Sequence, residues 1–272
     1  MSELTKTFST LKSRGEGALI AYVTAGDPSP ETTPSIVETL VKGGADIIEL
    51  GIPFSDPIAD GPTIQAASLR ALKAGITPKK VLQITEALKE KIKQPIVIMT
   101  YFNPIYKMGL RVFFESANAS GICGVIVPDL PIEEAGEYKK LAEMYNIDTI
   151  FFITPSSSSE RIKKTLDFTS GFLYLVSVFG VTGARNDIQQ ITIKLIKETL
   201  PITNGTIPLA VGFGISKPEH VQTVLKSGAD AAIVGSGFVK IIEDYYNYNN
   251  EKRILQALEE YSRKLKKATT KN

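Results

Sequence analysis

The sequence predicts an α/β fold, a (β/α)8 TIM barrel with an extra N-terminal helix, as a single domain over residues 1–272. Short apolar, β-branched runs recur eight times along the chain, and each is followed by a segment with helical periodicity. The 272 residues, 43% of them hydrophobic, suit one such barrel, which commonly takes about 250 residues. No GxGxxG motif follows the first apolar run, so a closed barrel is favoured over an open doubly wound sheet.

The predicted elements alternate from the N-terminus to the C-terminus. The apolar runs predict eight strands at residues 19–24, 46–50, 95–101, 122–127, 149–153, 172–177, 207–211 and 231–234. The periodic segments predict helices at residues 31–43, 62–74, 78–91, 110–120, 132–145, 158–168, 188–198, 217–227 and 238–244. Residues 3–13 should form the extra helix at the barrel's bottom, and residues 252–272 an amphipathic helix whose lysines form a solvated face. Pro78 suits a first helical turn, and Ser216 offers a capping hydroxyl before Pro218.

Composition excludes several classes of protein. A net charge of +2 gives no electrostatic footprint for nucleic acid, so we expect no nucleic-acid partner. The single Cys123 lies in an apolar run and is expected to be a core thiol. No run approaches the ~20 apolar residues that span a bilayer, and residues 1–15 contain no apolar signal segment. We therefore expect no membrane association and a cytoplasmic location, although a removed transit peptide would not be visible.

Two carboxylates near the second predicted strand suggest acid and base chemistry. Glu49 ends the apolar run at residues 46–50, where ligands bind in parallel α/β sheets and barrels. A buried carboxylate there needs a hydrogen-bond partner or a function, and a structural ion pair is the alternative. Asp60 follows in a loop rich in Pro and Gly, which excludes regular structure and can hold a side chain in place. Two carboxylates in different environments can differ in protonation, as acid and base catalysis requires.

Glycine-rich turns after the last two predicted strands indicate a phosphate site. They read Gly212-Phe213-Gly214-Ile215-Ser216 and Gly235-Ser236-Gly237. Glycine lets backbone N–H groups approach an anion, and the loops after strands seven and eight hold phosphate in many barrels. Tight turns without a ligand are the alternative. A third turn, residues 180–185, follows strand six and is either a lid over the site or a plain loop.

Some chemistries lack the residues that they need. No lysine ends a predicted strand, so a Schiff base is not expected. His220 is the one histidine and is predicted to be exposed on a helix, so we expect no histidine-based metal site and no metal. A Mg²⁺ site around Asp56 and Asp60 is an alternative without further support. The substrate should therefore supply its own electron sink.

The chain resembles the tryptophan synthase α subunit family along essentially its whole length. The resemblance rests on residues 22–28, on the specific segment 49–62, on residues 101–104, 127–131 and 180–183, and on the two phosphate turns. It implies reversible retro-aldol cleavage of indole-3-glycerol phosphate to indole and glyceraldehyde 3-phosphate. It also implies that indole passes to a β subunit in an α2β2 tetramer. Pyridoxal phosphate is expected only on that β subunit, and no cofactor on this chain.

The resemblance also assigns roles to residues. Glu49 would take the hydroxyl proton of the glycerol side chain and deliver a proton to indole C3, and Asp60 would hydrogen-bond the indole N–H. The implied substrate-binding residues are Tyr22, Tyr101, Tyr174, Thr182, Gly183, Gly214, Gly235 and Ser236. The implied β-subunit interface is a set of loops that contains Asp56, Pro57, Asn103, Pro104 and Pro131.

Three other functions stay open at this point. A stand-alone indole-3-glycerol phosphate lyase would share the fold and both acids, and would release free indole without a partner. A phosphosugar isomerase or epimerase could use the same barrel, although the missing histidine at a strand end argues against it. A catalytically silent regulatory subunit is opposed by the presence of both Glu49 and Asp60.

Overall fold

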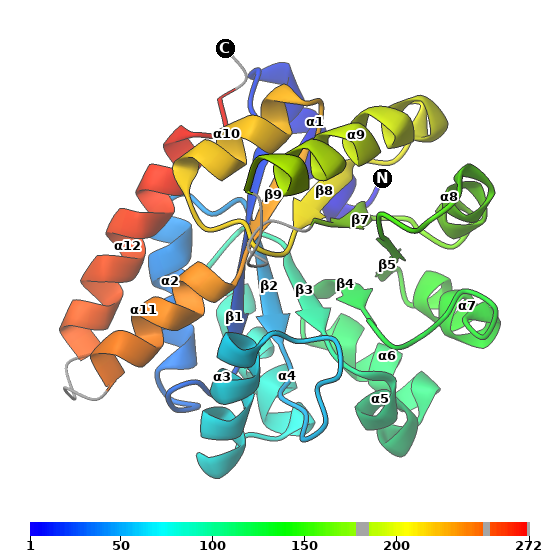
Figure 1. The fold of residues 1–272 in the computed structure, drawn as a ribbon. Coiled ribbons are helices and arrows are strands. Elements are labelled where there is room, and N and C mark those ends of the chain that lie inside the picture. Colours follow the sequence, from blue (N-terminus) through cyan, green and yellow to red (C-terminus); the bar gives the residue numbers. More distant parts are fainter. Residues whose placement is uncertain (178–184, 247–250, 271–272) are drawn as a thin grey trace.

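The computed structural model describes residues 1–177, 185–246 and 251–270, without side chains for residues 185–189, and confirms the predicted barrel (Figure 1). Over this part of the chain, the sheet has nine parallel strands in the order β5-β4-β3-β2-β1-β9-β8-β7-β6. Their bounds are Ala18–Thr24 (β1), Ile47–Gly51 (β2), Ile96–Met99 (β3), Ile122–Ile126 (β4), Asp148–Ile150 (β5), Phe152–Ile153 (β6), Leu173–Val176 (β7), Leu209–Gly212 (β8) and Ala231–Val234 (β9).

The ninth strand arises because the predicted fifth strand is divided. β5 and β6 are consecutive pieces separated by Phe151, and they stand at the two ends of the strand order. β5 pairs with β4 and β6 pairs with β7, while the Phe151 carbonyl accepts a hydrogen bond from the Tyr174 N–H at 3.0 Å. The sheet therefore closes on itself at residues 148–153, and the predicted fifth strand supplies both edges.

Helices surround the strands in Figure 1. Their bounds are Glu3–Ser13 (α1), Thr33–Lys42 (α2), Pro62–Lys73 (α3), Pro78–Lys89 (α4), Phe102–Met108 (α5), Leu110–Ala119 (α6), Gly136–Met144 (α7), Ser159–Leu166 (α8), Arg185–Thr203 (α9), Pro218–Lys226 (α10), Ser236–Tyr246 (α11) and Glu251–Lys267 (α12). Pro78 stands in the first turn of α4 as predicted, after Thr77, whose side chain accepts from the Lys80 N–H. None of these helices has the length and hydropathy to cross a bilayer.

Several helix boundaries differ from the prediction. α5 was not predicted, because Asn103-Pro104 suggests a loop, yet Pro104 lies in the first helical turn, where its missing N–H costs no hydrogen bond. α7 begins at Gly136, since residues 131–135 form turns. α9 is longer at both ends than the predicted helix and contains Pro201. The cap of α10 is Lys217, so the prediction that Ser216 caps this helix is wrong.

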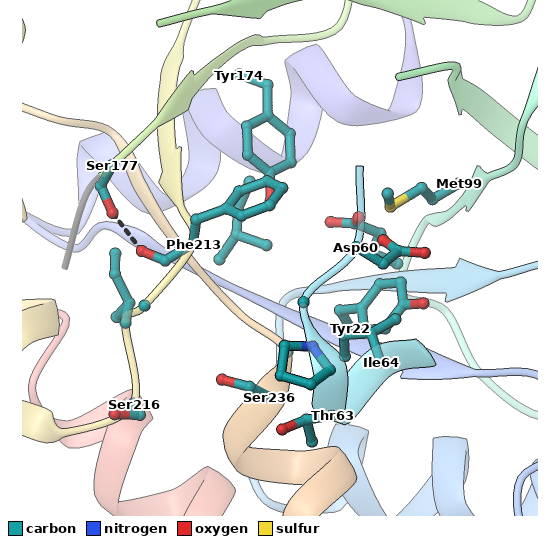
Figure 2. A pocket seen from close by; sticks show the side chains of 17 residues that line it. Tyr22, Asp60, Thr63, Ile64, Met99, Tyr174, Ser177, Phe213, Ser216 and Ser236 are labelled. Carbon is teal, nitrogen blue, oxygen red and sulfur yellow. Dashed lines mark hydrogen bonds between the residues drawn. The ribbon is translucent and has the colours of Figure 1, made fainter. Parts of the chain in front are cut away.

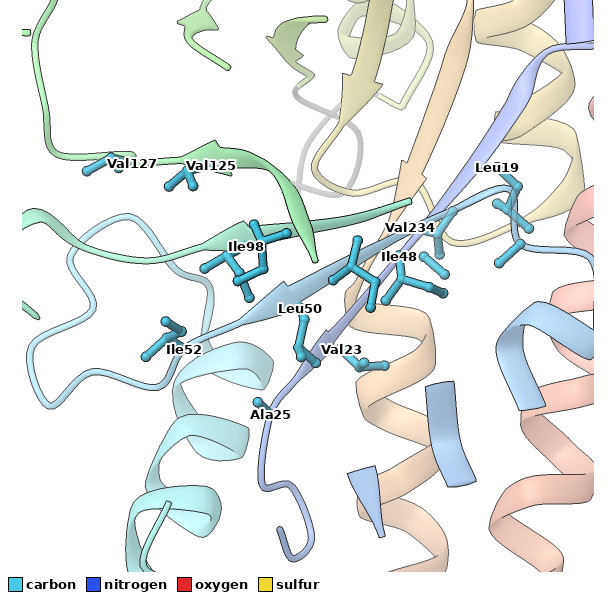
Figure 3. Close-up of a cluster of buried hydrophobic side chains, with 14 of the residues drawn as sticks. Leu19, Val23, Ala25, Ile48, Leu50, Ile52, Ile98, Val125, Val127 and Val234 are labelled. Carbon is cyan, nitrogen blue, oxygen red and sulfur yellow. The ribbon is translucent and has the colours of Figure 1, made fainter. Parts of the chain in front are cut away.

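Two hydrophobic clusters fill the two faces of the sheet. The cluster between strands and helices includes Leu19, Val23, Leu50 and Ile98 (Figure 3). The cluster inside the barrel is formed by side chains at alternate strand positions, together with Leu4, Phe8 and Leu11 of α1. α1 therefore packs against the barrel interior, as predicted for the extra helix. Cys123 belongs to the interior cluster and is buried, in agreement with the predicted core thiol.

The tail helix α12 buries Ile254, Leu258 and Leu265, as its amphipathic pattern predicts. Its lysines are not all solvated, and the prediction is wrong for Lys266. The Lys266 ammonium lies 2.8 Å from Glu16 and 3.0 Å from Asp46, at the end of the barrel where the strands begin. This contact joins the C-terminal helix to the start of β2.

Candidate active site

A cavity of about 530 Å³ opens at the carboxyl ends of the strands. Its walls are formed by Tyr22, Glu49, Asp60, Gly61, Pro62, Thr63, Ile64, Met99, Tyr174, Ser177, Phe213, Gly214, Ile215, Ser216, Ile233, Gly235 and Ser236. Figure 2 shows Asp60 and Ser236 in separate parts of this wall. The cavity therefore brings together both predicted acids and both predicted phosphate turns.

Glu49 extends from β2 into the barrel. It is opposite Tyr22 of β1 and Val97 of β3 in the sheet register, and alternation along the strand directs its side chain inward. The residue is 1% exposed, and its Oε2 atom has no hydrogen-bond partner among the described residues. Burial, with a smaller effect from Asp60, raises the pKa of Glu49 to about 8. The alternative of a structural ion pair is not observed for this carboxyl in the described part of the chain.

Asp60 is held at the cavity by Tyr101. The Tyr101 hydroxyl hydrogen-bonds the Asp60 carboxylate and accepts from the Ala59 N–H at 3.0 Å, while its ring stacks on Phe54 with centroids 5.3 Å apart. Burial raises the pKa of Asp60 to about 6, and the Tyr101 hydrogen bond opposes this rise. The two acids thus differ in pKa. Tyr101 contacts Asp60 and stands behind it rather than among the residues that line the cavity, and its role as a pocket wall stays a prediction.

The two tyrosines that do line the cavity fit because a glycine faces each. Tyr22 and Tyr174 are both buried. A Cβ at Gly51 would lie 2.4 Å from the Tyr22 hydroxyl, and one at Gly212 would lie 2.2 Å from the Tyr174 hydroxyl. Since no Cβ approaches another atom so closely, these glycines provide the space for the rings.

Both glycine-rich turns lie at the cavity. Gly214 lines it after β8, and Gly235 and Ser236 line it after β9. α11 starts at Ser236, which places a helix N-terminus next to the cavity. Glycine backbone and a helix N-terminus together favour an anion. The predicted lid, residues 180–185, lies outside the described residues as far as Ala184. This part of the lid includes Thr182 and Gly183.

Comparison with known proteins identifies the family. The sequence profile described as "Tryptophan synthase alpha chain" matches residues 8–270. The chain belongs to the tryptophan synthase alpha chain family. The alpha chain of Methanosarcina acetivorans is 50% identical over 97% of this chain and 93% of that relative, and the alpha chain of Prochlorococcus marinus is 46% identical over 98% and 94%.

Solved structures agree with this assignment. Tryptophan synthase subunit alpha from Legionella pneumophila is 34% identical, covers 99% of this chain and 98% of its own, and has a TM-score of 0.88. A chain in the tryptophan synthase complex from Pyrococcus furiosus is 40% identical, covers 92% and 98%, and has a TM-score of 0.83. As a tryptophan synthase alpha chain, the protein is a lyase of tryptophan biosynthesis, and the stand-alone lyase is not favoured.

The predicted interface residues of the alpha chain lie at the surface. Asp56, Asn103 and Pro131 are exposed, and Pro57 and Pro104 are partly exposed. Asn103 and Pro104 belong to α5 and not to a loop. The same surface carries two large apolar side chains, Ile58 and Tyr106, which are 83% and 68% exposed. These apolar side chains on neighbouring segments are typical of a protein-binding surface.

Sequence reasoning missed about half of the alpha chain's cavity wall. Two of the missed residues could have been found from strand alternation, because Met99 and Ile233 each stand two positions before a predicted site residue, Tyr101 and Gly235. Other residues give no local signal. Thr63, Ile64 and Ser177 come to the cavity through the packing of α3 and through the end of β7.

Metal binding finds no support in the part of the alpha chain that the structure describes, where no three His, Cys, Asp or Glu side chains group as ligands. Asp56 and Asp60 thus do not belong to such a group. His220 is half-buried, and its Nδ1 accepts from the Ser216 N–H at 3.4 Å. The prediction of an exposed His220 is therefore wrong, because the turn after β8 folds back onto α10.

Proposed function

We propose that the cavity binds indole-3-glycerol phosphate and cleaves it reversibly to indole and glyceraldehyde 3-phosphate. The observation that carries the proposal is the Glu49 carboxyl, which is buried, has an Oε2 atom without a hydrogen-bond partner in the described residues, and faces a cavity that Asp60 also lines. A buried polar atom without a partner is costly, and at a strand end in a barrel it is typical of a catalytic group.

Glu49 would move the protons of the cleavage. Delivery of a proton to indole C3 makes the ring an iminium. Removal of the proton from the hydroxyl on the attached carbon then breaks the carbon–carbon bond, whose electrons return to the ring while the carbon becomes an aldehyde. A pKa near 8 allows Glu49 to hold or to release a proton near neutral pH. Asp60, which titrates lower, would accept the indole N–H and stabilise the positive charge on the ring.

The remaining cavity residues would hold the two ends of the substrate. The Tyr22 and Tyr174 rings offer apolar surface for the indole. Gly214 in the turn after β8, and Gly235 and Ser236 at the start of α11, offer backbone N–H groups and a hydroxyl to the phosphate. Thr182 and Gly183 keep their proposed roles as lid hydroxyl and phosphate donor. Tyr101 would act on the substrate through Asp60, which it contacts.

A β subunit in an α2β2 assembly would be the partner that takes up the indole. Similarity to a chain of the Pyrococcus furiosus complex supports a partner, as do the exposed Ile58 and Tyr106 beside Asp56, Pro57, Asn103, Pro104 and Pro131. Pyridoxal phosphate would belong to that subunit, and this chain would need no cofactor. A cytoplasmic location is part of the same proposal.

Indole release from indole-3-glycerol phosphate by the purified chain, with and without a β subunit, tests this function. We expect slow release that rises sharply with the β subunit. Fast release from the isolated chain would favour the free-standing lyase. No release under either condition would contradict the roles of Glu49 and Asp60.

A further inference from the structure

The turn after β8, residues 213–216, is held at both ends by hydroxyl groups from distant parts of the chain. Ser177, which follows β7, donates to the Phe213 carbonyl, and Tyr261 of α12 donates to the Ser216 carbonyl. We infer that Ser177 and Tyr261 are positioning residues that keep this turn in the conformation that binds the substrate phosphate. The inference rests on the proposed function, because it assumes a phosphate ligand at Gly214.

The first end of the turn has a backbone conformation that needs support. Phe213 has φ +69°, in the left-handed region that residues with a Cβ rarely adopt, and Gly214 follows at φ +69°. Ser177 contacts the backbone on both sides of this point. Its N–H donates to the Gly212 carbonyl at 2.8 Å. Its Oγ donates to the Phe213 carbonyl, the hydrogen bond drawn as a dashed line in Figure 2. These two hydrogen bonds hold the peptide groups on either side of the Phe213 Cα.

The Phe213 ring depends on the same support. It lies in the cavity wall with its ring centroid 6.0 Å from that of Tyr174, at an interplanar angle of 69°. A change in the Phe213 backbone would therefore move an apolar wall as well as the Gly214 N–H.

The second end of the turn is anchored to the C-terminal helix. The Tyr261 hydroxyl donates to the Ser216 carbonyl at 2.6 Å, and the Tyr261 ring packs edge-on against Phe238 with centroids 5.0 Å apart. A Cβ at Gly237 would lie 2.1 Å from the same hydroxyl, so the glycine is needed for this approach. Tyr261 thus contacts both phosphate turns, one after β8 and one at the start of α11.

A turn that is held before the ligand arrives loses less conformational freedom on binding. Loss of either hydroxyl should therefore weaken binding of the phosphate and leave the proton transfer at Glu49 unchanged. A single hydrogen bond of this kind corresponds to about a fivefold change in affinity.

The experiment measures binding of two indole ligands to the full-length chain, indole-3-propanol phosphate and the same alcohol without phosphate. The chain contains no Trp, so indole fluorescence reports the ligand alone. We expect Ser177→Ala and Tyr261→Phe each to weaken the phosphate ligand about fivefold and the alcohol by less than about twofold. Ser177→Thr, which keeps the hydroxyl, should restore binding. In turnover, each variant should raise KM and leave kcat within about twofold.

Two matched controls remove similar hydrogen bonds far from the cavity. Tyr138 donates to the Val125 carbonyl at 3.3 Å, and Ser262, the neighbour of Tyr261 on α12, donates to the Leu40 carbonyl at 3.1 Å. Tyr138→Phe and Ser262→Ala should leave the ratio of the two affinities unchanged, whatever they do to thermal stability.

Each result separates the inference from the function beneath it. If a variant bound both indole ligands equally weakly, or bound both as tightly as the wild type does, the positioning role would be overturned. If only one of the two variants lost affinity selectively for the phosphate ligand, the role would be overturned for the other residue. If the wild-type chain bound inorganic phosphate but neither indole ligand, the proposed substrate would be wrong. Weaker phosphate binding by Ser177→Ala and Tyr261→Phe would then still support the positioning role, and unchanged binding would overturn it.

Discussion

Two carboxylates three residues apart, Asp46 and Glu49, lie at opposite ends of the barrel in different surroundings. Both are largely buried, and burial raises the pKa of each. Asp46, at the end where the strands begin, accepts from the Leu19 N–H at 2.8 Å and lies 3.0 Å from the Lys266 ammonium. Glu49, at the cavity, has an Oε2 atom without a hydrogen-bond partner in the described residues.

This difference separates a structural acid from a chemical one. Lys266 and the Leu19 N–H offset part of the cost of burying Asp46, and the Lys266 contact joins β2 to α12. The Glu49 Oε2 atom has no hydrogen-bond partner in the described chain, so the free-energy cost of burying it is not offset. This cost is found at the cavity, where a ligand would bind. The same strand thus shows which end of the barrel stabilises the fold and which end is available for chemistry.

Among the variants at the cavity end of the barrel, replacement of Glu49 should have the largest effect. Glu49→Gln preserves the size of the side chain and removes the proton carrier, so cleavage of indole-3-glycerol phosphate should fall by at least about 10³-fold. The fold should persist and indole-3-propanol phosphate should still bind. Single-turnover indole release measures the effect, and near-normal release would remove Glu49 from its role.

Asp60→Asn should have the next largest effect. The amide cannot stabilise a positively charged indole ring as a carboxylate does, so kcat should fall about 100-fold while KM changes little. Steady-state kinetics at saturating substrate would show this. A variant that loses affinity and keeps its kcat would place Asp60 in binding alone.

Gly235→Val should act on binding more than on chemistry. A Cβ at Gly235 would already lie 3.1 Å from the Tyr22 ring, and the two further methyl groups would crowd the anion. We expect KM to rise about tenfold or more with a smaller change in kcat. Normal affinity for indole-3-propanol phosphate in this variant would contradict the phosphate assignment.

Asp46→Ala should lower stability and spare activity, the opposite of the three variants at the cavity. It removes the partly buried ion pair with Lys266 and the hydrogen bond to the Leu19 N–H, which should lower the free energy of unfolding by about 2 kcal/mol. Activity of the folded enzyme should stay within about twofold, because Asp46 is remote from the cavity. Urea unfolding and indole release on the same preparation test both halves. Glu38→Ala, which breaks an exposed pair with Lys91, is the control and should cost less than about 1 kcal/mol.

The pH dependence of stability offers the finest test of the comparison. Since the folded pKa of Glu49 is raised to about 8 from an ordinary value of 4.5, the unfolded chain ionises this carboxyl between those pH values while the folded chain keeps the proton. Glu49 therefore makes the wild type less stable as pH rises through this window. The free energy of unfolding of Glu49→Gln minus that of the wild type should thus be more positive at pH 8 than at pH 5. A difference independent of pH would contradict the raised pKa.

The barrel and its two acids were predictable because their signals are local. Apolar runs and helical periodicity identify strands and helices, and Glu49 stands at the end of one such run. The division of the fifth strand at Phe151 and the helix α5 were not predictable in this way. Both depend on partners far along the chain, the Tyr174 N–H for Phe151 and the Asp129 carboxylate, which accepts from the Phe102 N–H at 2.9 Å.

The sequence by itself determined the eightfold alternation of strands and helices, the strand end that carries Glu49 and the two glycine turns, because each follows from neighbouring residues. Only the tertiary structure decided that Tyr101 contacts Asp60, that Gly51 and Gly212 make room for two tyrosines, and that Tyr261 holds the turn after β8. These contacts join residues up to 45 positions apart. They depend on strand register and helix packing, which arise only when the barrel closes.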